Sequence, residues 1–289
     1  MKEQKYILKN VKSFEPKHIF ECGQCFRWNL QEDNSYIGVV RNNVIRVSKD
    51  NDNIIFSGVF DEDIQKVCNE YFDLKNNYEK IKIELSKIDE YMAKSIEYGK
   101  GIRILNQDLW ETIISYIISA NNNIPRIKGI IERISKKYGK EIKWAEKTYY
   151  TFPTIEQLSK ATIEDLRKLG LGFRDKRVYE TTQMFLNKEI TLDELQKEKD
   201  IYILKEKLIS LPGVGPKVAD CIMLFSLKKY EIFPIDVWIR RVMNDLYIHN
   251  EDENKVSKTE IQRLAQEKYS NLAGLAQQYL YYWKRDIGA

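Results

Sequence analysis

The sequence has no long hydrophobic run, and this absence narrows the class of protein. No stretch approaches the roughly 18 consecutive apolar residues that a membrane-spanning helix needs. The opening run MKEQKY also lacks the apolar core of a secretory signal peptide. We therefore expect no association with a membrane and an intracellular location, in the cytoplasm or nucleoid if the host is prokaryotic.

Cysteine is scarce, with four residues in 289, and none follows position 221. Cys22 and Cys25 form one C-x-x-C pair, whereas Cys68 and Cys221 stand alone, so no second pair completes a four-ligand zinc site. A zinc or redox role for Cys22 and Cys25 is the less favoured alternative. We interpret all four as ordinary intracellular thiols and predict no metal site built from side chains.

A strong excess of charge of one sign is also absent. Lys and Arg number 47 against 43 Asp and Glu, which gives a net charge of +4. Any surface that binds nucleic acid must therefore be a local patch. Low-complexity linkers and repeats of fixed period are missing as well. A chain of 289 residues without such segments is long enough for two or three compact domains.

Alternating residues between polar turns predict an antiparallel sheet in the first part of the chain. Its strands are expected at Tyr36–Val40, Val44–Val47 and Ile54–Phe56. Helical spacing over Asp63–Phe72 predicts a helix packed on that sheet, and the pattern after Gly101 is helical almost throughout. The expected fold class is α+β, with an N-terminal antiparallel sheet domain over residues 1–100 and a mostly α-helical, two-lobed region over residues 101–289.

The run LPGVGPKVADC, within about residues 203–227, predicts two helices joined by a tight hairpin. Pro212 and Gly213 end the first helix. Gly215 is expected to take a positive φ before Pro216 begins the second helix. Backbone N–H groups in such a turn can point outward beside the positive end of a helix dipole. The hairpin is therefore a predicted anion site that binds a phosphate without sequence preference.

Lys217 lies in the first turn of the second predicted helix, where unsatisfied N–H groups already carry partial positive charge. This position and partial burial both favour the neutral form of an amine. We therefore expect a lowered pKa for Lys217 and a fraction of nucleophilic amine near neutral pH. An isolated lysine would instead be interpreted as an exposed surface residue, and it is the surrounding sequence that favours the functional interpretation.

The hairpin, together with the Pro-Ile-Asp run that ends at Asp236, resembles the helix-hairpin-helix motif of base-excision DNA glycosylases with lyase activity. Four further segments resemble the 8-oxoguanine DNA glycosylase/AP lyase family in the expected order: GQCFRW at 23–28, NNNIPR at 121–126, LGLGFR at 169–174 and AGLAQ at 273–277. One motif alone is a weak signal, but five ordered blocks are a strong one.

The resemblance implies a bifunctional enzyme whose partner is double-stranded DNA containing oxidised guanine. Such an enzyme flips out 8-oxoguanine, preferentially opposite cytosine, excises it and nicks the strand by β-elimination. Lys217 would attack C1′ of the sugar and form a Schiff base. Asp236, expected to be ionised at a helix start, would stabilise positive charge developing on the sugar and help to position Lys217. The protein is expected to act as a monomer.

The resemblance implies no required cofactor, although it allows a structural monovalent or divalent cation on the backbone carbonyls of the hairpin. Some members of the wider superfamily carry a four-cysteine iron–sulfur cluster near the C-terminus. No cysteine follows Cys221, so we expect no such cluster.

The resemblance also assigns a base pocket. Gly23 matches the residue whose carbonyl accepts the N7–H of 8-oxoguanine; guanine lacks this hydrogen and would leave the carbonyl unpaired, a loss of roughly 1–3 kcal/mol. Gln277 matches the residue that reads the Watson–Crick edge. Cys221 and Tyr281 would pack on the two faces of the base, although either could be a core residue, and Gly23 could be a simple turn glycine.

Two further residues complete the substrate-binding set, namely Gln24 beside Gly23 and Trp238 two positions after Asp236. Many relatives have a histidine at the position of Trp238, where it contacts a phosphate. An indole N–H can donate one hydrogen bond but carries no charge.

For the DNA-binding surface, the resemblance points to Asn121 as the plug that fills the space left by the flipped base, with Phe173 as a wedge. Arg126 and Arg174 match arginines that donate to the unpaired cytosine. Gly213 and Gly215 would lie against a phosphate. Without the resemblance, the three asparagines would be interpreted as a solvated loop or helix cap.

Two alternatives stay open. One is a related helix-hairpin-helix glycosylase for another damaged base, against which Lys217 and the missing cluster cysteines argue. The other is a non-catalytic DNA-binding protein that uses the hairpin only as a clamp. A clamp would not need an amine and a carboxylate that converge on one pocket.

Overall fold

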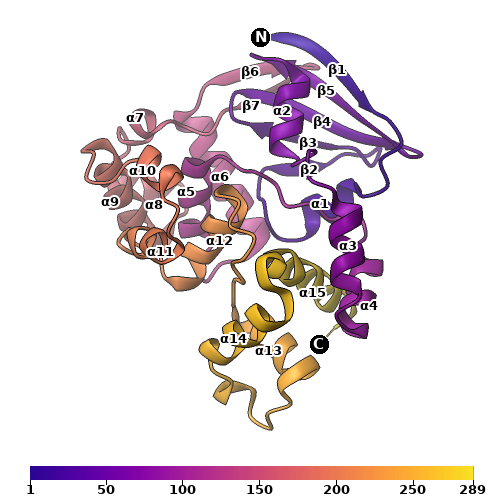
Figure 1. Cartoon of the computed structure of the whole chain (residues 1–289). Helices are drawn as coiled ribbons and strands as arrows, with labels where there is room; N and C mark the ends of the chain where they lie inside the picture. The colour runs from indigo at the N-terminus through magenta and orange to yellow at the C-terminus, as the bar shows by residue number, and fades with distance from the viewer. Residues whose placement is uncertain (289) are drawn as a thin grey trace.

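The computed structural model describes residues 1–288, which begin with a five-stranded antiparallel sheet in the order β1-β5-β4-β3-β2 (Figure 1). The strands are β1 (Lys2–Leu8), β2 (Trp28–Leu30), β3 (Tyr36–Val40), β4 (Asn43–Asp50) and β5 (Asn53–Phe60). The three predicted strands are confirmed. β1 and β2 are additional, and β1 pairs with β5 rather than with its neighbour in sequence.

The sheet has one buried face, because its apolar side chains alternate along the strands. Buried and partly exposed residues alternate along the whole of β5. The helices α1 (Pro16–Glu21) and α2 (Ile64–Tyr71) contribute buried residues to the same core, which confirms the predicted helix over Asp63–Phe72. Asp63 caps α2 by accepting a hydrogen bond from Lys66 N, as expected for an aspartate at this position.

The rest of the chain is mostly helical, which confirms the α+β fold class. The helices are α3 (Tyr78–Ser86), α4 (Glu90–Tyr98), α5 (Leu109–Ser119), α6 (Ile124–Tyr138), α7 (Ile155–Leu158), α8 (Ile163–Lys168), α9 (Asp175–Leu186), α10 (Leu192–Lys197), α11 (Ile201–Ile209), α12 (Pro216–Ser226), α13 (Val237–Met243), α14 (Lys258–Tyr269) and α15 (Ala273–Ile287). Short turns of helix are η1 (Gly172–Arg174), η2 (Asn244–Ile248), η3 (Glu253–Lys255) and η4 (Ser270–Leu272), and a small hairpin of β6 (Glu141–Trp144) and β7 (Lys147–Tyr150) follows α6.

Two main hydrophobic cores divide the molecule. One lies under the sheet, and the larger one runs through the helices around α5, whose residues 109–110 and 112–118 are all buried. Helices α3 and α4 contribute to the helical core and lie beside α15 (Figure 1). The division of the chain at residue 100 stays a prediction, since α4 precedes it and yet packs against the last helix.

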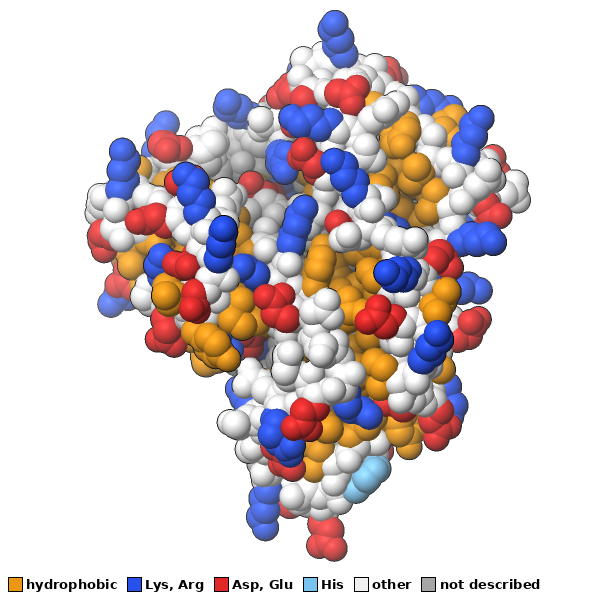
Figure 2. All heavy atoms as spheres, in the orientation of Figure 1, with side chains coloured by type: hydrophobic (Ala, Val, Ile, Leu, Met, Phe, Trp, Pro, Cys, Tyr) orange, Lys and Arg blue, Asp and Glu red, His pale blue; other side chains and the backbone are white. Residues whose placement is uncertain are grey.

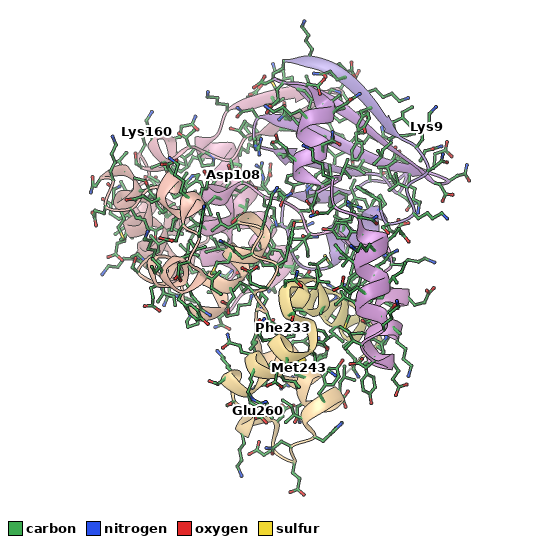
Figure 3. All side chains as sticks on the ribbon, viewed as in Figure 1. Lys9, Asp108, Lys160, Phe233, Met243 and Glu260 are labelled. Carbon is green, nitrogen blue, oxygen red and sulfur yellow. The ribbon has the colours of Figure 1, made fainter. Side chains whose placement is uncertain are left out.

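The C-terminal helices form a lobe of their own below α11 and α12 in Figure 1. The segment between α12 and α13 connects the two parts, and its Phe233, labelled in Figure 3, is buried in the helical core. On the face drawn in Figure 2, acidic and basic side chains are interspersed, in keeping with the small net charge. Within residues 1–288, no helix combines the length and the apolar character needed to cross a bilayer.

Candidate active site

The predicted hairpin is present, with α11 ending at Ile209 and α12 beginning at Pro216. The predicted positive φ of Gly215 is wrong. Gly213 has the positive φ, +88°, whereas Gly215 has φ −93° and ψ 177° and serves as the N-cap of α12. A Cβ added to Gly213 would lie 2.9 Å from Cδ of Arg177 and 3.0 Å from Cγ2 of Ile117. The tight turn is therefore made at Gly213.

Gly215 has a different environment, because a Cβ added there would meet no atom within 4 Å. The glycine lies at the N-terminus of α12, where backbone N–H groups have no partner inside the helix. Open space beside such a terminus suits the approach of a phosphate oxygen. The two glycines thus differ: one shapes the turn, and the other leaves room in front of it.

Five segments of the chain meet around one cavity of about 360 Å³, a volume that includes its open mouth. They are the loop after α1, helix α5, helix α12, the start of α13 with the residues before it, and helix α15. The lining residues are Cys22, Gly23, Tyr116, Lys217, Cys221, Phe225, Pro234, Asp236, Gln277, Gln278 and Tyr281. The structure brings together six residues that the sequence assigned to catalysis or the base, namely Gly23, Lys217, Cys221, Asp236, Gln277 and Tyr281.

Asp236 reaches the cavity as the N-cap of α13. Its Oδ1 accepts a hydrogen bond from Ile239 N at 2.8 Å, which satisfies one of the free N–H groups at the helix start. Pro234 and Ile235, just before it, are buried. The carboxyl group is therefore fixed by the helix that it caps rather than by a flexible loop.

Lys217 has a raised pKa, so the predicted lowering is wrong for the free protein. The Cys221 sulfur raises the pKa most, burial lowers it, and Asp236 raises it again. Burial in turn raises the pKa of the Cys221 thiol to about 11. Lys217 is thus an ammonium at neutral pH and must lose a proton before it can act as a nucleophile.

The aromatic neighbours of Lys217 come from two other helices. Its Nζ lies 5.6 Å from the ring centroid of Tyr116, a fully buried residue of α5 that the sequence analysis missed. Tyr281, on α15, is only partly exposed, and its Cε1 would lie 3.1 Å from a Cβ added to Gly23. Gly23 has φ +84°, so a side chain there would be strained and would also press on this ring. The sequence offered no signal for the role of Tyr116, because a tyrosine within the buried run of α5 could equally be a core residue.

Gln24 does not line the cavity, and its assignment to the substrate is wrong. The residue is fully buried. Its Nε2 donates to the carbonyls of Ile19 at 2.9 Å and Arg103 at 2.8 Å, and its Oε1 accepts from Leu105 N at 2.9 Å. Buried amides need such partners. Gln24 therefore anchors the loop that carries Gly23 to the segment before α5, and acts on the cavity only through that loop.

Trp238 is also outside the lining of the cavity. The residue is partly buried on α13 and packs against the helical core. Its Nε1 is buried and has no hydrogen-bond partner within the described part of the chain. The predicted contact between this indole and the substrate is therefore not supported, because the N–H is directed into the protein.

Outside the lining of the cavity, four residues assigned to DNA meet where the loop after α5 contacts the segment before α9. We call this group the rim: Asn121, Arg126, Phe173 and Arg174. Asn121 follows α5 with a left-handed φ of +51° and is exposed. Asn123 caps α6 by accepting from Arg126 N at 3.0 Å, so one of the three asparagines does serve as a helix cap.

Phe173 in η1 is 55% exposed, with the guanidinium carbons of Arg174 and Arg177 at 4.1 and 5.2 Å from its ring centroid. Two cations thus support an exposed aromatic side chain.

The two predicted cytosine-binding arginines differ. Arg126 is exposed, with one 3.4 Å hydrogen bond to the carbonyl of Gly170. Arg174 is 1% exposed and donates from Nε to Ala120 O at 2.9 Å and from Nη2 to Asn121 O at 2.7 Å. In this structure Arg174 is therefore not free to bind cytosine; it holds the backbone of the asparagine loop.

Each of the four cysteines is a free, buried thiol. Burial raises the pKa of Cys22 to about 12 and that of Cys25 further, so neither is an accessible thiolate near neutral pH. Among residues 1–288, no group of three or more His, Cys, Asp or Glu side chains could hold a metal ion.

Two family models together match most of the chain. A model for the "8-oxoguanine DNA glycosylase, N-terminal domain" matches residues 6–113. A model for an "HhH-GPD superfamily base excision DNA repair protein" matches residues 114–271. The second match contains the hairpin, Lys217 and Asp236.

Named relatives point the same way. The N-glycosylase/DNA lyase of Saccharomyces cerevisiae is 32% identical over 269 residues, which cover 83% of this chain and 70% of that protein. A probable N-glycosylase/DNA lyase of Methanothermobacter thermautotrophicus is 34% identical, covering 75% of this chain and 73% of that protein. The crystal structure of Clostridium acetobutylicum 8-oxoguanine glycosylase/lyase, bound to double-stranded DNA with cytosine opposite 8-oxoguanine, has a TM-score of 0.93 and 42% identity, and the match covers 99% of this chain and 97% of that one.

Proposed function

The chain belongs to the 8-oxoguanine DNA glycosylase family of base-excision repair proteins, and on this premise we propose that it excises 8-oxoguanine opposite cytosine from double-stranded DNA and then nicks the strand as an AP lyase. The observation that carries the proposal is the convergence of an amine, Lys217, and a carboxyl group, Asp236, on one cavity. A DNA clamp has no use for that pair.

Recognition of the lesion begins with the flipped base inside the cavity. The Gly23 carbonyl accepts the N7–H that distinguishes 8-oxoguanine from guanine, and Gln277 hydrogen-bonds the Watson–Crick edge. Tyr281 and Cys221 pack on the two faces of the ring. Gln24 contributes indirectly, since its backbone hydrogen bonds hold the loop in which Gly23 lies.

Excision starts when Lys217 loses its proton. Entry of the base expels water, and a drier site favours the neutral amine. The Lys217 nitrogen then attacks C1′, and the bond from C1′ to the base breaks with its electron pair leaving on the base, which gains a proton. Asp236 stabilises the positive charge that develops on the sugar.

Strand cleavage follows from the covalent adduct. Ring opening of the sugar gives a Schiff base between Lys217 and C1′. Loss of a proton from C2′ then breaks the bond between C3′ and its oxygen, and water finally hydrolyses the Schiff base. The complete sequence of steps returns the protein to its starting state without an external oxidant or reductant.

The rim would hold the DNA around this pocket. Asn121 fills the space left by the flipped nucleotide, Phe173 wedges the neighbouring base pair and Arg126 binds the unpaired cytosine. A phosphate lies against the hairpin beside Gly215. We propose that the protein acts as a monomer inside the cell, in the cytoplasm or nucleoid if the host is prokaryotic, and that any bound cation sits on hairpin carbonyls.

The test is reductive trapping. Duplexes containing 8-oxoguanine, thymine glycol or no damage, each opposite cytosine, are incubated with the protein and borohydride, which reduces a Schiff base to a stable amine. We expect a covalent protein–DNA adduct and a nick with 8-oxoguanine alone. In Lys217→Gln the adduct should disappear and single-turnover excision should fall on the order of 10³-fold or more, while binding to the lesion duplex is retained.

Two outcomes would refute the proposal. A preference for thymine glycol would indicate a glycosylase for another lesion, and an undiminished adduct in Lys217→Gln would remove this amine from the mechanism. Lys160→Gln is a matched control, since Lys160 is exposed and does not line the cavity.

A further inference from the structure

Gln278 is a polar residue of the cavity that the proposed mechanism leaves without a task. It follows Gln277 on α15, is 4% exposed and lines the same cavity. Its Nε2 donates a 2.8 Å hydrogen bond to Oε1 of Gln277. Its own Oε1 is buried and has no hydrogen-bond partner among the described residues.

These contacts fix the orientation of both amides. Because Gln278 donates to Oε1 of Gln277, the Nε2 of Gln277 stays available as a donor. The Oε1 of Gln278 is a buried acceptor without a partner among the described residues, which is unfavourable. Such an atom is satisfied best by a donor that arrives with the ligand.

The donor can be identified from the chemistry of the base. The Watson–Crick edge of 8-oxoguanine presents one acceptor, O6, followed by two donors, N1–H and the exocyclic 2-amino group. A single glutamine amide offers one donor group and one acceptor, so it cannot pair with all three positions in ideal geometry. Two adjacent glutamines offer a second acceptor.

We propose that Gln278 is a second specificity-determining residue of the base pocket, whose Oε1 accepts a hydrogen bond from the 2-amino group of the flipped purine while its Nε2 holds the amide of Gln277. The inference rests on the proposed function and deepens it. It predicts selection for lesions derived from guanine over those derived from hypoxanthine or adenine, which carry no 2-amino group.

The experiment compares two substrates that differ only in this group: duplexes with 8-oxoguanine or 8-oxohypoxanthine opposite cytosine. Single-turnover excision rates are measured for the wild type, Gln278→Met and Gln278→Glu. Methionine keeps the length of the side chain and removes both polar atoms, whereas glutamate keeps an acceptor at Oε1. Melting temperature and binding to a duplex with an abasic-site analogue, which has no base to read, report on folding.

The informative quantity is the preference for 8-oxoguanine in the wild type divided by that in the variant. The two duplexes differ in pairing strength, but this difference is the same for every enzyme and cancels in the ratio. We expect the wild-type preference to fall about tenfold in Gln278→Met, mainly through a slower reaction of 8-oxoguanine. Gln278→Glu should keep most of the preference, although its overall rate falls because it no longer donates to Gln277.

Equal preferences in the wild type and Gln278→Met would overturn the inference, as would a loss of preference in Gln278→Glu as large as in Gln278→Met. If Gln278→Met does not fold, the comparison of Gln278→Glu with Gln278→Leu decides the point by the same criterion. Failure of the wild type to act on 8-oxoguanine would refute the proposed function instead, so the two failures are distinguishable.

Discussion

The cavity and its rim differ in how firmly the protein holds their side chains in place. In the cavity, Gln277 is 5% exposed and Asp236 is fixed by the helix that it caps. On the rim, Phe173 is 55% exposed, and Asn121, just after α5, is exposed as well. Chemistry needs groups that are positioned before the substrate arrives, whereas opening a duplex needs side chains that are free to enter it. The side chains of the pocket are therefore positioned before DNA binds, whereas those of the rim take their final positions when DNA binds.

Arg174 lies on the boundary between the two regions and qualifies this contrast. Its position in the sequence places it with the rim, but its guanidinium is buried against the carbonyls of Ala120 and Asn121. The rim thus has one prearranged part, the backbone that presents Asn121. The contrast would be contradicted by a cavity variant that chiefly changes the affinity for DNA, or by a rim variant that chiefly changes the rate of the chemical step.

Among the variants beyond Lys217, Asp236→Asn should have the largest effect. Asparagine is as good an N-cap as aspartate, so α13 should stay intact while the charge is lost. We expect single-turnover excision to fall on the order of 10²-fold with nearly unchanged affinity for the lesion duplex. A fall in affinity without a change in the chemical step would contradict the assignment of Asp236 to the cavity.

The same variant predicts a change in the pH profile. Below the pKa of Lys217 the fraction of neutral amine rises tenfold with each pH unit, so excision should accelerate as pH increases. Asp236 raises the pKa of Lys217, and its removal should displace this rising limb to lower pH. Single-turnover rates measured from about pH 6 to about pH 9 check the sign; a displacement to higher pH would show that the two groups do not interact as described.

Phe173→Ala should have a smaller effect that depends on the substrate. Removal of the wedge should slow excision from a paired duplex about tenfold, because separating stacked, paired bases costs a few kcal/mol. With the lesion opposite an abasic site, where no pair has to be broken, the rates should be nearly equal. Tyr202→Ala is a matched control, because Tyr202 is 77% exposed and does not line the cavity. An equal loss on both substrates would place Phe173 in the chemical step.

The smallest effects should come from the two hairpin glycines, and they should differ in kind. Gly213→Ala forces a side chain onto a φ of +88° against Arg177 and Ile117, which should lower the free energy of unfolding by about 1–2 kcal/mol. Gly215→Ala meets no atom and should leave stability unchanged but weaken DNA binding a few-fold. Urea unfolding and fluorescence anisotropy measure the two quantities. Equal losses of stability in both variants would contradict the distinction.

Local patterns predicted the elements well, because each depends on neighbours in the chain. The alternation from Tyr36 to Phe56 predicted three strands, and the Pro-Gly run predicted the hairpin. β1 was missed because Lys2–Leu8 becomes a strand by pairing with β5, about fifty residues away in the chain. Sequence similarity also identified six of the cavity residues, since short motifs carry both the backbone turn and the side chain that uses it.

Similarity gave the wrong role where a polar residue of a motif hydrogen-bonds the backbone of another part of the protein. Gln24 and Arg174 both lie in segments that resemble the family, and both donate hydrogen bonds to backbone carbonyl groups of the protein. The sequence cannot show this, because the partners are distant: Gln24 and Arg103 are 79 positions apart. Gln278 was missed for the related reason that nothing in the sequence distinguishes a cavity-lining glutamine from a surface one.

The amino-acid sequence by itself determined the hairpin, the place of Lys217 in the first turn of a helix and the cap at Asp236, because all three follow from the backbone preferences of a few consecutive residues. Only the tertiary structure decided which side chains meet in the cavity and in which direction the pKa of Lys217 moves. That direction is the balance of burial against the contributions of Cys221 and Asp236, and such a balance exists only once α12, α13 and α15 are packed together.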